Sequence, residues 1–118
     1  MTTRVFRVTV RGVFCDLDAA QRTALLDRAS EHSVLRAAFT PEGHLSYDIA
    51  VRTAFTFRFQ DTGEREEDIV AAVERAETVA WAWLDERGYG YKNLRAQGED
   101  LSQAPLGKRQ RREAARRG

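Results

Sequence analysis

Three polar residues in the middle of the chain are of the types used in nucleophilic catalysis. His44, Ser46 and Asp48 alternate with apolar residues in H-L-S-Y-D. Residues two apart on a strand lie about 6.5 to 7 Å apart along the backbone, whereas a nucleophile and its base must approach to about 2.6 to 3.2 Å. A Ser–His–Asp triad is therefore not expected, and no G-x-S-x-G motif surrounds Ser46. The pattern favours a solvated polar strand face, with His44, Tyr47 and Asp48 as the acid or base residues of an alternative function as an enzyme.

Arginines are predicted to gather on the same face of a sheet. These are Arg7, Arg11, Arg36 and Arg58. Planar guanidinium groups bind carboxylates and phosphates through paired hydrogen bonds, so the cluster predicts an anion-binding surface. Two other interpretations stay open: the arginines keep an uncovered sheet soluble, or they pair with Asp48 across the symmetry axis of a dimer.

The C-terminal end predicts contact with a polyanion. It reads G-K-R-Q-R-R-E-A-A-R-R-G and holds one acidic residue and six basic ones, which are Lys108, Arg109, Arg111, Arg112, Arg116 and Arg117. Clustered cations bind phosphate backbones without sequence preference, although a solubilising end has the same composition. An RNA-recognition motif of the RNP1 type is absent.

Trp81 occupies an unusual position on a predicted helix. It lies about 120° from the centre of the apolar stripe that contains Trp83, beside Glu74 and Glu77. An exposed indole is typical of an interface, so Trp81 is predicted to contact a second protomer or a ligand, unless the helix rolls enough to bury both indoles.

Most cofactor chemistry has no motif in this chain. There is no P-loop, no G-x-G-x-x-G, no H-E-x-x-H and no zinc-ligand spacing, so neither a cofactor nor a metal is expected. The single cysteine, Cys15, cannot form an internal disulfide, and no segment has the composition of a signal peptide or a membrane span. The sequence predicts a cytoplasmic protein that does not bind membranes.

The elements that must position these residues follow from hydrophobic periodicity and turn residues. Strands are expected at 4–11, extending to about 15, and at 34–40, 44–49, 55–60 and 89–97, with helices from 18 to about 32 and from about 64 to 87. Asp18 and Gln21 form a predicted capping box, and Thr40 to Gly43 form a predicted hairpin turn.

This order predicts an α+β fold of the ferredoxin-like split βαβ type, with two helices covering one face of an antiparallel sheet. A chain of 118 residues with a net charge of +1 fits one domain, predicted at 1–98, and a basic tail at 99–118. The covered face is expected to take Phe6, Val8, Val10, Phe39, Leu45, Tyr47, Phe55, Phe57 and Phe59. The alternate residues, including the arginines, are expected on the open face.

Three segments are similar to a known family: R-V-F-R-V-T-V-R-G, V-L-R-A-A-F-T-P-E-G-H-L-S-Y-D and R-G-Y-G-Y-K-N-L-R-A. Over residues 4 to about 100 the chain resembles a family of small actinobacterial proteins classed as a domain of unknown function. The resemblance implies an actinobacterial, cytoplasmic protein and no particular reaction.

The sequence thus predicts a non-catalytic binding protein, a homodimer, whose arginine-rich sheet face and basic tail hold nucleic acid or a small anion. The alternative is a small cofactor-independent enzyme, a cyclase or isomerase of the dimeric α+β-barrel type, that acts on a small metabolite.

Overall fold

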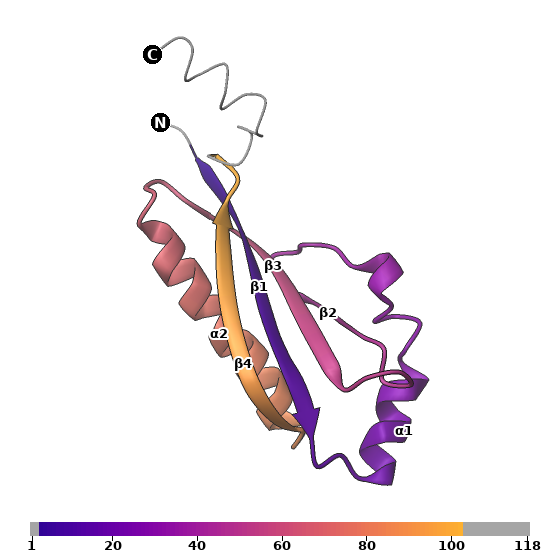
Figure 1. Ribbon diagram of the computed structural model, residues 1–118. Coiled ribbons are helices and arrows are strands. Elements are labelled where there is room, and N and C mark those ends of the chain that lie inside the picture. Colours follow the sequence, from indigo (N-terminus) through magenta and orange to yellow (C-terminus); the bar gives the residue numbers. More distant parts are fainter. Residues whose placement is uncertain (1–2, 103–118) are drawn as a thin grey trace.

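A computed structural model describes residues 3–102 and shows a four-stranded sheet with two helices (Figure 1). Along the chain the elements are β1 (Arg4–Cys15), α1 (Ala19–Asp27), a 3-10 helix η1 (Val34–Arg36), β2 (His44–Tyr47), β3 (Ala54–Gly63), α2 (Asp68–Glu86) and β4 (Gly90–Asp100). The strand order is β2-β3-β1-β4, and every neighbouring pair is antiparallel. The α+β class is therefore confirmed.

Alternation of apolar and polar residues in β1 and β3 places the core. Phe6, Val8 and Val10 are fully buried, and their partners in β3 include the buried Phe57 and Phe59. Arg58, between those two phenylalanines, faces the opposite side of the sheet, as the period of two requires. The predicted phase of both strands is confirmed.

Helix α2 covers this apolar face along β1 and β4 (Figure 1). The Asp68 carboxylate accepts hydrogen bonds from the backbone N–H groups of Glu64 and Arg65, both at 2.9 Å, and so fixes the start of the helix. Gly98 of β4 allows the close approach, because a Cβ atom there would lie 2.8 Å from Val73 and 3.0 Å from Ile69.

Helix α1 begins as predicted and is shorter than predicted. Asp18 and Gln21 form the capping box, with the Asp18 carboxylate 2.7 Å from the Gln21 backbone nitrogen. The helix ends at Asp27, and Leu25 is its buried residue. It lies beyond the β2 side of the sheet rather than along it, so α2 makes most of the helical cover that two helices were expected to share (Figure 1).

The predicted strand at 34–40 and its hairpin are wrong. The Ser33 side chain accepts a hydrogen bond from Leu35 N–H and caps the 3-10 turn η1. The chain then runs to Thr40, which pairs with Phe59 of β3 rather than with β2. Phe39 consequently lies outside the core, with the Arg7 guanidinium 4.9 Å from the centre of its ring. The tight turn itself is present and ends at Gly43, whose φ is +90°.

Strand β4 ends at Asp100, two residues past the C-terminal boundary at 98 that the sequence predicted for the domain. Asp100 forms an ion pair with Arg4 at 2.9 Å, and Leu101 N–H donates to the Val5 carbonyl. The basic residues of the predicted tail lie outside the described residues. Within residues 3–102, no helix is long and apolar enough to cross a membrane.

Candidate anion-binding site

A β-bulge between β1 and β4 shapes the open face of the sheet. The register changes between Arg11 and Val13, and Asn93 adopts a left-handed conformation with φ of 58°. Arg11 lies directly opposite Arg95, and Val13 lies opposite Lys92. The extra residue in β4 therefore keeps both Lys92 and Arg95 on the open face.

A hollow of about 400 Å³ lies at this bulge. Its lining consists of Thr9, Arg11, Gly12, Val13, Asn93, Arg95 and Gln97. Two guanidinium groups, two amides and a hydroxyl thus surround one volume. Such groups supply hydrogen-bond donors to the oxygens of a carboxylate or a phosphate.

The side chains of Arg11 and Arg95 have no ion-pair or hydrogen-bond partner within residues 3–102. Like charges placed directly opposite each other on neighbouring strands destabilise a sheet, so a bound anion would relieve their repulsion. On the described strands of this face, Glu99 is the one carboxylate, and it lies opposite Arg7. The surroundings of the hollow are therefore positive.

The other arginines of the predicted anion-binding surface differ in their contacts and in their positions. Arg58 donates a hydrogen bond to the Ser46 hydroxyl at 2.6 Å, and Arg7 packs against Phe39. Arg36 lies in η1, outside the sheet, because residues 34–36 form a 3-10 turn. The structure thus brings Arg7, Arg11 and Arg58 to one face and leaves Arg36 away from it.

Sequence reasoning missed Arg95 and Lys92. Alternation in R-A-Q, at the end of the strand expected at 89–97, already places Arg95 and Gln97 on one face. The bulge at Asn93 gave no signal, because nothing in the composition of a strand marks an extra residue.

The residues of the alternative enzymatic site do not come together as a group. Tyr47 lies in the core, 3% exposed, whereas Asp48 is exposed beyond the end of β2. The Tyr47 hydroxyl donates to the Leu25 carbonyl at 2.6 Å and lies 3.0 Å from Nδ1 of His32. Burial raises the pKa of Tyr47 to about 12 and lowers the pKa of His32 below its usual value.

His44 lines a second hollow, of about 300 Å³, on the helix side of the sheet. His32 and Trp83 line both this hollow and a neighbouring one of about 290 Å³ that reaches Tyr47. Nδ1 of His44 is buried without a hydrogen-bond partner within residues 3–102. His32 was also missed by sequence reasoning, since it lies between two elements where no periodicity marks it.

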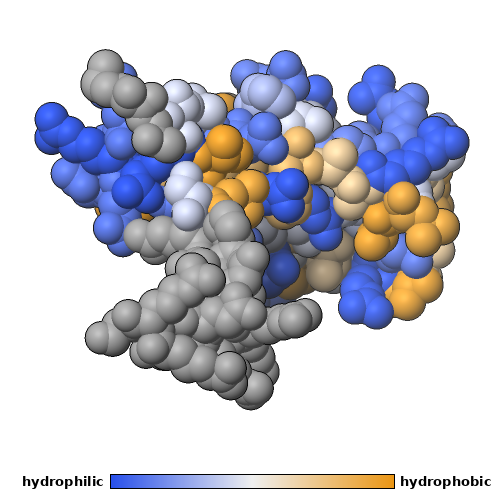
Figure 2. Space-filling model, turned by 90° about the horizontal axis from the view of Figure 1, so that it is seen from above, coloured by the Kyte–Doolittle hydropathy of each residue, from blue (hydrophilic) through white to orange (hydrophobic). Residues whose placement is uncertain are grey.

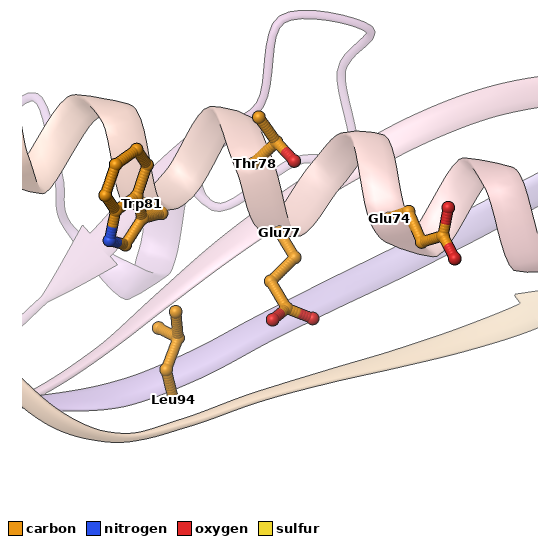
Figure 3. Close-up of a pocket in the computed structure, with 5 residues that line it drawn as sticks. All are labelled: Glu74, Glu77, Thr78, Trp81 and Leu94. Carbon is orange, nitrogen blue, oxygen red and sulfur yellow. The ribbon is translucent and has the colours of Figure 1, made fainter.

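The two tryptophans of α2 have different surroundings. Trp83 packs against Phe57 and Tyr89, with the Arg87 guanidinium 4.2 Å from its ring centre. Trp81 is 48% exposed and lines a fourth hollow, between α2 and β4 (Figure 3). The helix therefore does not roll far enough to bury both indoles.

Comparisons with known proteins identify the family of this chain, and they do not indicate a reaction or a ligand. Within residues 3–102, no three His, Cys, Asp or Glu side chains are grouped so that they could hold a metal ion. No curated protein and no solved structure matches the chain. The model of a family of unknown function, DUF6204, matches residues 1–112, so the chain belongs to the DUF6204 family.

Proposed function

We propose that this protein is a non-catalytic binding protein that holds an anionic partner at the bulge between β1 and β4. The observation that carries the proposal is the direct opposition of Arg11 and Arg95, neither of which has a partner within residues 3–102, at the wall of a hollow of about 400 Å³. Two positive charges on directly opposite strand residues repel each other and destabilise the sheet. An anion bound between them would form charge-assisted hydrogen bonds with both guanidinium groups.

The volume and the lining of the hollow support a class of ligand. A small molecule with a carboxylate or phosphate group fits a hollow of this size, with Asn93, Gln97 and Thr9 binding its polar atoms. Phosphates of a nucleic acid have the same chemistry and would extend across the face towards Arg58 and Arg7. The basic residues between 108 and 117 would add affinity that does not depend on nucleotide sequence.

The proposal includes a fold family and an assembly. We infer the ferredoxin-like plan, which the strand order β2-β3-β1-β4 and the all-antiparallel pairing support. We also infer a homodimer in the cytoplasm of an actinobacterium. Support for a dimer comes from exposed apolar side chains at η1, where Val34 is 58% and Leu35 97% exposed; Figure 2 shows apolar surface on that side of the molecule.

The test compares the full chain with the double variant R11Q/R95Q. Inorganic phosphate, a dicarboxylate and a labelled single-stranded RNA are titrated against each protein at low salt. Hydrogen bonds to charged groups contribute about 1.5 to 3 kcal/mol each, so the double variant should bind at least about tenfold more weakly.

The matched control removes two arginines elsewhere. Arg52 and Arg65 are exposed and lie in the loops before β3 and before α2. R52Q/R65Q changes the net charge equally and should retain binding of phosphate and dicarboxylate. Equal affinities for R11Q/R95Q and the unmodified chain would exclude the bulge as the site.

A second candidate function is the cofactor-independent enzyme. The observations that favour it are the buried Nδ1 of His44, which has no hydrogen-bond partner within residues 3–102, and the hollow that His44 and His32 both line. Native mass spectrometry of the purified protein separates the two proposals. A bound metabolite that is lost in H44A and kept in R11Q/R95Q supports the enzyme, and the reverse supports anion binding at the bulge.

A further inference from the structure

The hollow beside Trp81 lies between the outer side of α2 and β4, which forms one edge of the sheet (Figure 3). It has a volume of about 390 Å³ and is lined by Glu74, Glu77, Thr78, Trp81 and Leu94. Figure 3 shows the Glu77 carboxylate directed from the helix towards β4, with the Trp81 indole on the helix and Leu94 rising from the strand below it. The hollow thus combines an apolar floor with acidic groups.

The chemistry of this lining fits a basic, partly apolar chain segment. Glu74, Glu77 and Trp81 are spaced three and four residues apart, so they share one face of α2. Neither glutamate forms an ion pair within residues 3–102. An indole face attracts a guanidinium or ammonium group, and neighbouring carboxylates strengthen that attraction. The alkyl stems of lysine and arginine would cover Leu94 and the indole.

We propose that the C-terminal segment of this same chain, residues 103–118, docks in the hollow. The six basic residues between 108 and 117 supply the complementary charge. The segment begins after Ser102, directly beyond β4, the strand that forms one wall of the hollow. Charge and chain connectivity therefore favour this occupant.

The length of the segment fits the path. Strand residues rise about 3.3 Å each, so Leu94 lies about 26 Å back along β4 from Ser102. An extended chain covers a similar distance per residue, which brings Lys108 and Arg109 about 20 to 23 Å from Ser102 and Arg111 and Arg112 about 30 to 33 Å. On a path that returns beside β4, the first two cations lie near Glu74 and Glu77 and the next two near Trp81. The family match ends at residue 112 and so includes these four cations.

Docking has a consequence that rests on the proposed function. The cations that contact α2 are those that would otherwise bind a polyanion, so the docked segment withholds them. Docking itself needs no polyanion, and its test is carried out without one.

The experiment follows trypsin cleavage in the full chain by intact mass, at the bonds after Lys108, Arg109, Arg111 and Arg112. The reference is a synthetic peptide of residues 103–118, which has the same cleavage sites and no hollow. Two ion pairs and a cation–π contact should slow cleavage in the full chain about tenfold at low salt. Because the contacts are exposed, 0.5 M salt should restore the rate of the peptide.

Two double variants separate the hollow from general charge. E74Q/E77Q should be cleaved at the rate of the peptide. D85N/E86Q removes two exposed carboxylates of α2 that do not line the hollow and should stay protected. Cleavage of the unmodified chain at the peptide rate, or equal protection in both variants, would overturn the proposal. Protection that rises with protein concentration would assign the hollow to the segment of a second copy and would likewise overturn docking within one chain.

Discussion

The Tyr47 hydroxyl joins α1, the loop after it and the sheet at one point. It donates to Leu25 of α1 and lies 3.0 Å from Nδ1 of His32. The first cause of the lowered pKa of His32 is burial; His44, Arg28 and Arg87 lower it further, and Glu31 opposes them. A neutral imidazole that donates from Nδ1 to the Tyr47 oxygen satisfies both groups. Burial raises the pKa of Tyr47, so its hydroxyl keeps the proton that it donates to the Leu25 carbonyl.

This pair predicts a loss of stability in mild acid. The unfolded chain binds a proton at His32 near pH 6.5, whereas the folded chain binds it only at lower pH. The contribution of His32 to stability is therefore complete above about pH 6.5 and is lost as the pH falls through the lower pKa of the folded state. Urea unfolding between pH 7.5 and 5 should show a steeper loss for the unmodified chain than for H32Q. Parallel pH profiles would show that His32 does not titrate between the two states.

At the same scale, the arginine site could be predicted in part. Alternation in β1 and β3 placed Arg7, Arg11 and Arg58 on the open face, because a strand with one buried face fixes where each side chain lies. The partner of Arg11 depended on the register of β4, and the bulge at Asn93 sets that register. A bulge depends on contacts between distant segments, which a single strand sequence does not encode.

Among the elements, the contact between α2 and β4 depends on one small residue. A Cβ atom at Gly98 would lie 2.8 Å from Val73, too close for the present packing, and Ile69 is 3.0 Å away. G98V should therefore force α2 away from β4 and destabilise the fold by about 1 to 3 kcal/mol, as overpacking does. Urea unfolding measures this, with Q97A on the exposed side of the same strand as the control. A stability of G98V equal to that of Q97A would mean that the helix is not packed against this strand as described.

The elements also divide into those with strong local signals and those without. The capping box of α1 and the alternating phenylalanines of β3 specify their structure within a few residues, and both were predicted. Residues 34–40 have an extended pattern, but the Ser33 cap and the contact of Phe39 with Arg7 favour a turn and a loop. The second contact joins residues 32 positions apart, so local propensity could not predict it.

Across the whole molecule, charge is distributed unevenly. The last 12 residues carry six basic residues and one acidic one, while the rest of the chain has more acidic residues than basic ones. Within the described part, the open face of the sheet is positive near Arg11 and Arg95, and the outer side of α2 is negative near Glu74 and Glu77. A polyanion would therefore meet two separate basic regions, whereas a small anion would meet one.

The salt dependence of binding distinguishes these two ligands. For single-stranded nucleic acid the slope of log K against log salt is about −0.7 for each phosphate neutralised. If RNA is the ligand and contacts both arginines at the bulge, R11Q/R95Q should make the slope less steep by about 1.4, on the same relation. Binding of labelled RNA between 50 and 300 mM salt measures the slope for each protein.

A dicarboxylate ligand predicts the opposite pattern. The unmodified chain should bind RNA weakly, with a shallow slope, and R11Q/R95Q should leave that binding unchanged. The same variant should lose its binding of the dicarboxylate. The variant thus separates the two ligands by which affinity it removes, and R52Q/R65Q, with the same net charge, shows how much of any change in slope comes from total charge alone.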